Sequence, residues 1–381
     1  MPPVTYLDAN ASEPLRPEAR EAALAALDLF GNPSSVHSAG RAARRMLEDA
    51  RDGIAACFGV DPSGVVFTSG GTEADALAIA ALGSGRRVLF GATEHDAVRQ
   101  AVPGGIGSGG AAAIPVSADG TLSLPALSAL LDEPGAAPAL VCVMAANNET
   151  GVLHPLREVA ALCRARGALL HVDAVQAAGR SPVSLPGCGA DSMALSGHKL
   201  GGPKGAGALL LGPQAATAFR APLIAGGGQE RGRRGGTPSL PALAGFAAAA
   251  MAACRDLAGT SERLGALRAG VEAAATRCGA VVVGGNAPRI GNTACLALPG
   301  RAALPQLIAL DLAGIAVSAG AACSSGKVAR SHVLDAMGLG GLADAAIRVS
   351  LPWNAVAGDV DRFAAAYERM AAAAAGRGAG S

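Results

Sequence analysis

The stretch at residues 168–199, ALLHVDAVQAAGRSPVSLPGCGADSMALSGHK, carries the pattern that decides the fold. It contains two short and almost continuously apolar runs, at 168–173 and 191–196. Runs of this length and composition are typical of strands that are buried on both faces of a sheet. Each run ends in a polar residue, Asp173 in the first and Ser196 in the second. The stretch therefore also predicts polar side chains at the ends of the two strands.

The same pattern repeats on both sides of this stretch. Further strands are predicted from five runs, at 65–68, 87–91, 113–116, 139–144 and 207–211. Helix-like periodicity lies between them, at 72–82, 96–102, 124–131 and 155–166. Strands that alternate with helices form a largely parallel sheet covered on both faces. We therefore predict an α/β fold whose large domain has a mostly parallel seven-stranded sheet flanked by helices.

The rest of the chain has a different rhythm. A segment rich in glycine and arginine, at 226–236, is followed by two alanine-rich helical stretches at 240–257 and 261–278. Beyond them we predict strands at 280–283, 292–298, 315–318 and 347–351, and helices at 303–312, 329–337 and 356–375. This order predicts a smaller α+β domain. We place the large domain at 15–255 and build the small domain from 1–14 together with 256–381.

Composition excludes several classes of protein but assigns no function. The 381 residues are half hydrophobic, and 31 basic side chains face 30 acidic ones. This balance argues against a disordered protein and against a partner that is nucleic acid or an anionic membrane. The longest apolar stretch, at 242–253, is too short to cross a bilayer, and no signal-like segment opens the chain. With eight cysteines but no CxxC pair, we expect a cytoplasmic protein.

Residues 67–73, FTSGGTE, predict an anion site. A strand here runs into two glycines and then a helix. Free N–H groups at the start of a helix attract an anion, and glycine lets a phosphate approach the backbone closely. The segment matches neither the Walker pattern nor G-x-G-x-x-G. An ordinary turn in which Thr72 caps the helix is the alternative, and it stays open from the sequence alone.

Asp173 and Lys199 each end a predicted strand. In open α/β sheets ligands bind at the carboxyl ends of the strands. Asp173 could cap a helix there, and Lys199 could be a solvated loop lysine, so neither residue is diagnostic alone. A helix start for a phosphate, an acid on one strand end and a lysine on another are together what pyridoxal 5'-phosphate requires.

Nine segments, in the same order, resemble those of the cysteine desulfurases in the class V aminotransferase family, which have the fold of type I pyridoxal-phosphate transferases. They are YLD (6–8) with NA (10–11), GNPSS (31–35), TSGGTE (68–73), TEH (93–95), NNETG (147–151), HVDAVQ (171–176), SGHK (196–199), GGGQERGRRGGT (226–237) and IRVSL (347–351). The resemblance covers nearly the whole chain.

The resemblance implies a role for each matched position. Lys199 forms the Schiff base with the cofactor, and Asp173 pairs with its ring nitrogen. His95 stacks on the ring and moves protons, and Gln176 and Asn148 lie at the side of the ring hydroxyl.

The remaining implied roles concern the phosphate and the substrate. Gly71, Thr72, Ser196 and His198 hold the phosphate, and Thr237 reaches the phosphate of a neighbouring subunit, which implies a homodimer. The guanidinium of Arg348 clamps the substrate carboxylate, a task that suits its bidentate geometry. Asn10 and Asn148 also lie on the substrate side.

The cysteines divide into two groups. Six of them lie in apolar or helical stretches and are expected to be buried packing residues: Cys57, Cys142, Cys163, Cys254, Cys278 and Cys295. Cys188, in a Pro/Gly loop, is ambiguous.

Cys323 lies among small residues with Lys327 nearby, a setting that could expose a thiol and lower its pKa. An ordinary loop cysteine is the alternative. The resemblance implies that Cys323 takes sulfur from the substrate and holds it as a persulfide. We expect no intrinsic metal site, although Cys323 could contact a transient iron–sulfur cluster.

The resemblance therefore implies an enzyme that converts L-cysteine to L-alanine and passes sulfur to an acceptor or to an iron–sulfur scaffold protein. Three alternatives stay open: a selenocysteine lyase, a class V aminotransferase for small amino acids, and a catalytically weak sulfur carrier. Glu13 stands where many relatives have threonine, and we expect it near the entrance of the site, where it could alter substrate access.

Overall fold

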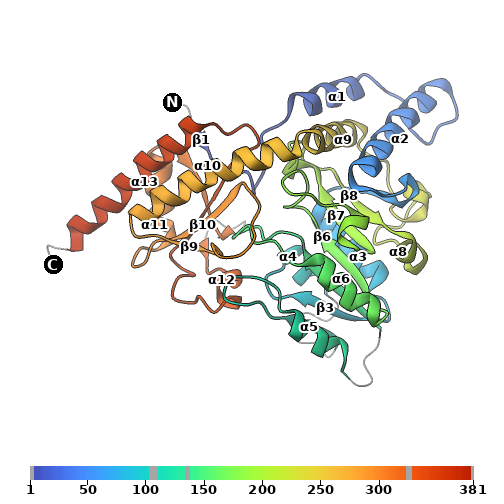
Figure 1. The fold of residues 1–381 in the computed structure, drawn as a ribbon. Helices are drawn as coiled ribbons and strands as arrows, with labels where there is room; N and C mark the ends of the chain where they lie inside the picture. Colours follow the sequence, from blue (N-terminus) through green and yellow to red (C-terminus); the bar gives the residue numbers. More distant parts are fainter. Residues whose placement is uncertain (1–3, 103–109, 134–137, 323–327, 379–381) are drawn as a thin grey trace.

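The protein folds into two lobes, which lie side by side in Figure 1. The structure is a computed structural model, and it describes residues 4–102, 110–133, 138–322 and 328–378. The larger lobe is built on a seven-stranded sheet and the smaller on a four-stranded sheet. The predicted boundary between two domains falls at residue 255, where helix α9 ends, and it stays a prediction.

The seven-stranded sheet confirms the predicted fold class. Its strands are β2 (Val65–Thr68), β3 (Arg87–Gly91), β4 (Ala111–Ile114), β5 (Ala139–Met144), β6 (Leu169–Asp173), β7 (Ser192–Ser196) and β8 (Gly207–Leu211). Their spatial order is β2-β8-β7-β6-β5-β3-β4. Only β8 runs antiparallel to its two neighbours, and the other pairs are parallel. The strands β2, β3, β5, β6 and β7 therefore all end at the same edge of the sheet.

Helices cover both faces of this sheet because the strands are apolar on both sides. In β5, Val141 and Val143 join one core cluster, whereas Leu140 and Cys142 join the other. One face is covered by α2 (Ser38–Phe58), α5 (Leu124–Leu131), α6 (Leu156–Ala165) and α9 (Leu240–Arg255). The opposite face is covered by α3 (Gly71–Leu82), α4 (Asp96–Arg99) and α8 (Pro213–Ala218). The remaining elements of this lobe are α1 (Pro17–Leu27), which packs on α9, α7 (Leu185–Cys188) and three 3-10 turns, η1 (Pro62–Gly64), η2 (Gly197–Lys199) and η3 (Gln229–Gly232).

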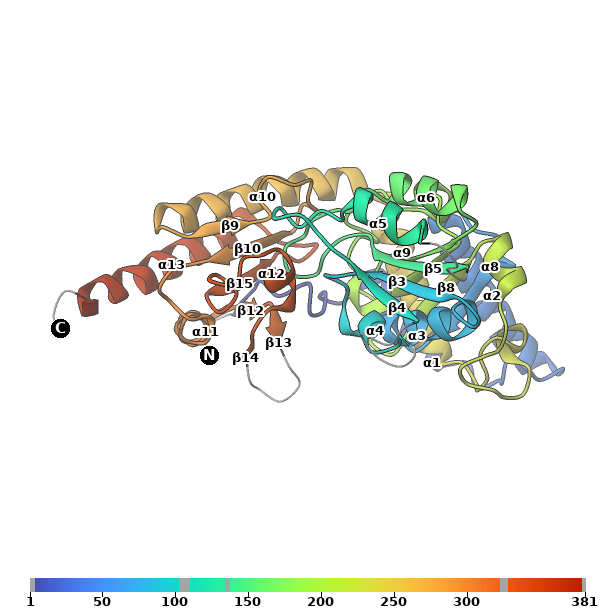
Figure 2. The ribbon, with the colours of Figure 1, turned by 90° about the horizontal axis from the view of Figure 1, so that it is seen from below.

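The smaller lobe is an antiparallel sheet with helices on both sides. Its strands, in spatial order, are β12 (Ser318–Ala319), β15 (Ala346–Ser350), β10 (Thr293–Ala297) and β9 (Val281–Val283). One core cluster joins this sheet to α10 (Leu257–Arg277), α11 (Ala303–Leu312) and α13 (Ala357–Gly378), and another joins it to α12 (His332–Ala336). Figure 2 shows α10 and α13 running together along this lobe, with α11 beside them and the β13–β14 pair (Ala321–Ala322 and Val328–Ala329) extending from it.

The N-terminal residues also belong to the smaller lobe. Strand β1 (Thr5–Tyr6) pairs in parallel with β11 (Ile315–Ala316), and Leu7 is buried in the core of this lobe. The predicted strand at 315–318 is wrong as a single element. It divides into β11, which pairs with β1, and β12, which pairs with β15. The two neighbouring segments pair with strands from distant parts of the chain, and a local sequence pattern does not reveal these pairings.

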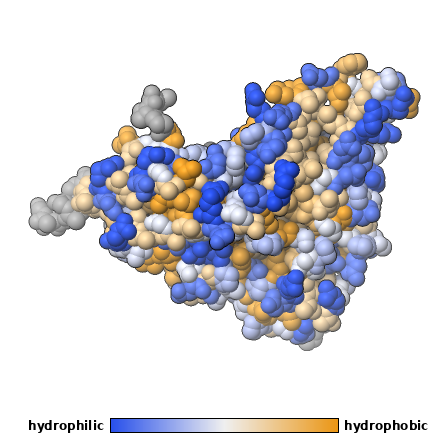
Figure 3. Space-filling view, turned by 45° about the horizontal axis from the view of Figure 1, so that its top comes forward, coloured by the Kyte–Doolittle hydropathy of each residue, from blue (hydrophilic) through white to orange (hydrophobic). Residues whose placement is uncertain are grey.

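No single helix among the described residues is long and apolar enough to cross a membrane, and only α9 and α10 taken together pass that test, as a pair bent by 76°. Figure 3 shows hydrophilic and hydrophobic side chains interspersed over the face that it presents.

Candidate active site

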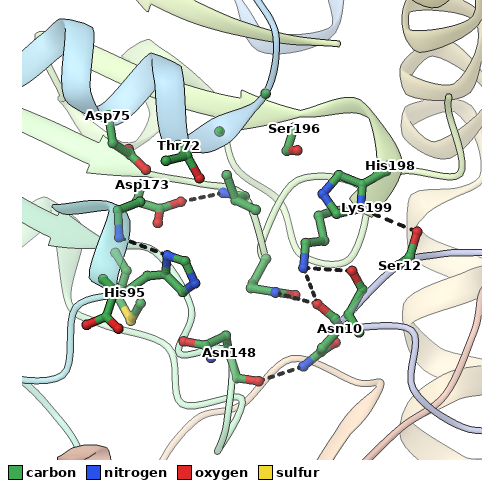
Figure 4. Close-up of a pocket in the computed structure, with 18 of the residues that line it drawn as sticks. Asn10, Ser12, Thr72, Asp75, His95, Asn148, Asp173, Ser196, His198 and Lys199 are labelled. Carbon is green, nitrogen blue, oxygen red and sulfur yellow. Dashed lines mark hydrogen bonds between the residues drawn. The ribbon is translucent and has the colours of Figure 1, made fainter. Parts of the chain in front are cut away.

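A pocket of about 630 Å³ lies at the edge where the parallel strands end. Both lobes contribute to its lining, the larger through strand ends and the smaller through β15 and the residues before β13. Figure 4 shows polar side chains from distant parts of the chain around this pocket. The predicted site residues that line it are Asn10, Gly71, Thr72, His95, Asn148, Asp173, Gln176, Ser196, His198, Lys199 and Arg348.

One wall of the pocket is the start of α3. The helix begins at Gly71, and Gly70 precedes it without a side-chain cap, so the alternative in which Thr72 caps the helix is not observed. A Cβ atom on Gly71 would lie 2.6 Å from Cγ2 of Val175, which is too close. Glycine therefore lets the helix start approach the strand ends closely. The N–H groups there stay available to an anion in the pocket.

Lys199 enters the pocket from η2 at the end of β7. Its Nζ donates hydrogen bonds to the backbone oxygens of Asn10 and Ala11, the latter at 3.1 Å. Burial, with the positive charges of Arg180 and Arg348, lowers the pKa of Lys199 to about 7. The side chain is half-buried, so it is not the solvated loop lysine of the alternative interpretation. Near neutral pH much of this amine is uncharged and able to act as a nucleophile.

This lowered pKa leads to a prediction for the protein stripped of any cofactor. Only a neutral amine reacts with an acylating reagent, so acylation of Lys199 should rise with pH and level off just above pH 7. The rate is measured at each pH by peptide mass spectrometry, with the exposed Lys204 of the same pocket as the internal reference. If the rate instead keeps rising to about pH 10, as for an ordinary lysine, Lys199 is not desolvated as the structure indicates.

Asp173 ends β6 and faces the pocket with a buried carboxyl group. Its Oδ1 accepts a hydrogen bond from the N–H of Val175 at 2.9 Å, so the carboxyl does cap a local turn, as one interpretation of the sequence allowed. Burial, together with the negative charge of the nearby Asp75, raises the pKa of Asp173 to about 7. A cationic group in the pocket would restore the charged carboxylate, and this makes Asp173 a fitting partner for a protonated ring nitrogen.

Asp75 also lines the pocket, beside Asp173 in Figure 4, and was not predicted from the sequence. Its Oδ1 is 3.1 Å from Nε2 of His171, and Nδ1 of that ring is 2.9 Å from Oγ of Ser192. All three side chains are buried, and burial lowers the pKa of His171 to about 4. A single acid at the fifth position of α3 gives no periodic signal, so only the folded structure reveals this series of polar contacts.

His95 is held by its place at the start of α4. Its Nδ1 accepts a hydrogen bond from the N–H of Ala97 at 3.1 Å. The proton of the neutral ring is therefore assigned to Nε2, the nitrogen left free for a ligand. Figure 4 places the ring between Asp173 and Asn148. In this position His95 can stack on a planar ligand and exchange a proton with it.

Arg348 reaches the pocket from β15 of the smaller lobe. Its Nη2 lies 2.8 Å from Oδ1 of Asp8, and its Nη1 donates to the backbone oxygen of Asn148 at 3.2 Å. Its Nε is buried without a hydrogen-bond partner. Arg348 lines the pocket, and a guanidinium there is suited to binding a carboxylate that enters it.

Asn10 and Gln176 are oriented by contacts within the protein. Nδ2 of Asn10 donates to the backbone oxygen of Asn148 at 3.0 Å and to Oγ1 of Thr293 at 2.9 Å. Oδ1 of Asn10 accepts from Asn292 at 3.1 Å. The amide of Asn10 thus joins the two lobes, and both of its N–H donors are used. Nε2 of Gln176 donates to the backbone oxygen of Asn10 at 3.1 Å.

Comparison with known proteins decides the family. The model of the class V aminotransferases matches residues 5–363. The chain belongs to the class V aminotransferase family. Among curated relatives, an IscS-like cysteine desulfurase of Mycobacterium tuberculosis is 39% identical over 372 residues, with 94% of each chain covered. A cysteine desulfurase of Cereibacter sphaeroides is 42% identical, with 94% of this chain and 93% of the relative covered.

Solved structures agree with this family. A NifS-like protein from Rickettsia africae matches with a TM-score of 0.88 at 32% identity, covering 96% of this chain and 99% of the other. The resemblance that the sequence suggested is therefore confirmed, together with the fold of type I transferases. The roles of individual site residues in this class V aminotransferase stay predictions, because their places in the pocket do not by themselves assign a function.

Two residues singled out from the sequence lie away from the pocket in this class V aminotransferase, and a third is not described. Thr237 is exposed and does not line the pocket. Cys323 lies outside the described residues. The expectation that Glu13 lies at the pocket entrance is wrong: its buried carboxylate accepts from Nη2 of Arg180 and from the N–H of Trp353, each at 3.1 Å. A buried arginine draws Glu13 away from the pocket.

Glu149 is a further buried residue of the pocket; it lies in the NNETG segment but was not predicted as a site residue. Its Oε2 accepts from Oγ of Ser331 at 2.6 Å. The same oxygen would lie 1.9 Å from a Cβ on Gly320, so glycine is required there. Glu149 thus contacts residues on both sides of the β13–β14 pair, and that pair brackets Cys323 in the sequence.

The described residues contain no cluster of three His, Cys, Asp or Glu side chains able to hold a metal ion.

Proposed function

We propose that the protein is a pyridoxal-phosphate-dependent cysteine desulfurase, which converts L-cysteine to L-alanine and leaves the sulfur on Cys323 as a persulfide. One observation carries the proposal: the Lys199 amine, with its lowered pKa, shares a pocket with the buried carboxyl of Asp173 and the uncapped start of α3. Relatives about 40% identical over most of the chain are named cysteine desulfurases. Because this reaction depends on reduced thiols, we expect it to take place in the cytoplasm.

The residues of the pocket fit pyridoxal phosphate. Asp173 has no positively charged partner within hydrogen-bonding distance in the described chain, and its raised pKa marks a carboxyl that a cationic ring nitrogen would stabilise. The close approach at Gly71 suits the phosphate. When bound, the cofactor supplies an electrophilic carbon for amines and a cationic ring that withdraws electrons from the bonds next to it.

The protein's own groups then hold and move protons and orient the substrate. Nζ of Lys199 is half neutral near pH 7, so it can give up or take a proton at little cost. His95 offers Nε2 for the same purpose on the neighbouring wall. The guanidinium of Arg348 fixes the substrate carboxylate. In the sulfur step Sγ of Cys323 bonds to the substrate sulfur, the carbon–sulfur bond breaks, and the carbon takes up a proton to give alanine.

We also propose a homodimer in which Thr237 completes the partner's site. Thr237 is exposed and follows a loop fixed by two ion pairs. Glu230 binds Arg51 through both carboxylate oxygens at 2.8 and 2.9 Å, and Arg234 binds Glu73 at 2.8 Å. Large apolar side chains are exposed on the same lobe, at Leu24, Leu27, Phe30, Val36, Leu223 and Ile224. A second subunit packed on these side chains would remove apolar surface from water, which supports the proposed dimer.

The function is tested with the cofactor-loaded enzyme and L-cysteine labelled at sulfur. We expect one alanine for each sulfur released and label on the peptide that contains Cys323. The variant Cys323→Ser should lose the label. The variant Cys278→Ser, which removes a half-buried cysteine directly after helix α10, should keep it. Label without Cys323 would contradict the persulfide step, and cofactor without alanine would favour the aminotransferase alternative. Faster turnover of selenocysteine, with Cys323 dispensable, would favour the lyase.

Arg348→Ala should raise the KM for L-cysteine by about 10- to 100-fold with a smaller change in kcat, because a charged hydrogen bond to the carboxylate contributes about 1.5–3 kcal/mol. Steady-state kinetics measures both constants. Arg330→Ala, which removes a half-exposed arginine paired with Asp335 and Asp344, is the matched control and should leave KM unchanged. A KM for Arg348→Ala equal to that of the unaltered enzyme would show that another group binds the carboxylate.

A further inference from the structure

Two cysteines outside the active site meet where α2 packs against α9. The thiol of Cys57 on α2 donates a hydrogen bond to the sulfur of Cys254 on α9. One helical turn earlier the same two helices touch at Gly53 and Met251: a Cβ on Gly53 would lie 2.8 Å from Sδ of Met251. Residues three or four apart share one face of a helix, so the thiol pair continues this contact. The absence of a side chain at Gly53 brings the helices close enough for the two sulfurs to meet.

The pair is also accessible, unlike most other cysteines of the described chain. Cys57 and Cys254 are half-buried, which corrects the expectation of buried packing residues, as it does for Cys278. Cys142, Cys163, Cys188 and Cys295 are buried, and this settles the ambiguous Cys188. The side chain of Cys278 has no thiol beside it among the described residues. Only at Cys57 and Cys254 do partial exposure and a neighbouring thiol occur together in the described structure.

The two thiols are not equivalent. The hydrogen bond from Cys57 lowers the pKa of Cys254, and the guanidinium of Arg16 nearby lowers it further. The same hydrogen bond raises the pKa of Cys57, with burial adding to the effect. Since the thiolate is the reactive form, Cys254 is the thiol of the pair that attacks first, and Cys57 is the thiol that attacks in the second step.

We propose that Cys57 and Cys254 form a redox-active dithiol that a small disulfide, such as glutathione disulfide, converts to an intrachain disulfide joining α2 to α9. The thiolate of Cys254 attacks one sulfur of the small disulfide, forms a mixed disulfide and releases one thiolate. The thiol of Cys57 then loses its proton and attacks Sγ of Cys254. This step forms the Cys57–Cys254 bond and releases the second small thiol. Two protein thiols are oxidised and one small disulfide is reduced to two thiols.

The site is independent of the proposed desulfurase chemistry, since neither cysteine lines the pocket. Cys254 of this pair nevertheless lies close in the sequence to a residue that packs next to the Lys199 loop. A Cβ on Gly179 would lie 3.0 Å from Cβ of Ala253, next to Cys254, and 2.5 Å from Cδ2 of Leu200, next to Lys199, so these side chains pack around the same glycine. A covalent link at Cys254 therefore fixes a helix that supports the lysine loop.

The experiment equilibrates the cofactor-loaded enzyme with glutathione buffers of increasing oxidation. Remaining thiols are alkylated after an acid quench, and peptides are mapped by mass spectrometry. We expect Cys57 and Cys254 to lose alkylation together and to appear in one linked peptide pair, which reduction separates. The thermal unfolding midpoint of the oxidised enzyme should rise, because the link closes a long loop in the unfolded chain.

Three variants complete the test. Cys57→Ser should stop at the mixed disulfide on Cys254, Cys254→Ser should give no linked peptide and little reaction at Cys57, and Cys278→Ser should behave like the unaltered enzyme. Circular dichroism verifies that each variant is folded. A mixed disulfide on Cys254 without the linked peptide in the unaltered enzyme would overturn the proposal, as would no reaction at either cysteine or a linked peptide that joins other residues.

Discussion

The variant Lys199→Ala should form alanine from L-cysteine at least about 10⁴-fold more slowly than the unaltered enzyme, since it removes a nucleophile and a proton carrier at once. Nζ is the only lysine amine of the described chain that is both half-buried in the pocket and shifted to a pKa of about 7. The visible absorption band of the lysine-bound cofactor should also disappear, although cofactor held by the other residues would still be found by mass spectrometry.

Lys204→Ala is the matched comparison, because Lys204 lines the same pocket but is exposed. Its loss should weaken retention of the anionic cofactor and leave the absorption band intact once the cofactor is in excess. If Lys204→Ala rather than Lys199→Ala removed the band, the lysine assignment would be reversed. Equal losses in both variants would indicate that the two amines act only through their charge.

Asp173→Asn should slow the reaction by about 10³-fold, an effect comparable to the loss of one preorganised electrostatic contact at a reacting centre. The amide keeps the shape of the side chain and the hydrogen bond from Val175, but it cannot become negatively charged. A cationic ring nitrogen would therefore lose its partner. Single-turnover kinetics measures the rate, and the pH at which the bound cofactor's spectrum changes should fall because the ring loses its proton more easily.

Asp191→Asn is the control for this prediction. Asp191 precedes β7 at the opposite end of the strands and accepts from the N–H of Leu170 at 2.8 Å, so it is a partly buried carboxylate on the same sheet without access to the pocket. Its substitution should lower stability slightly and leave the spectrum unchanged. A rate for Asp173→Asn within a few-fold of the control would show that the ring nitrogen does not depend on Asp173.

Most of the central sheet could be predicted from the sequence because its strands are buried on both faces. A strand such as β5, with apolar residues on both sides, appears as one unbroken apolar run. The long helix α2 was not predicted, although its apolar residues repeat with helical spacing. The break between β11 and β12 could not be predicted, because it depends on pairing with β1 and β15, which lie far away in the sequence.

The sequence by itself determined the family, the α/β fold and the residue types needed at the pocket, because ordered motifs survive in the chain as local signals. Only the tertiary structure decided how these residues are charged and connected. Burial shifts the pKa values of Lys199 and Asp173. The ion pair with Arg180 holds Glu13 away from the pocket. The side-chain amide of Asn10 forms hydrogen bonds that join the two lobes. Charge and hydrogen bonding depend on neighbours that the chain brings together from distant positions, and the order of residues does not reveal those neighbours.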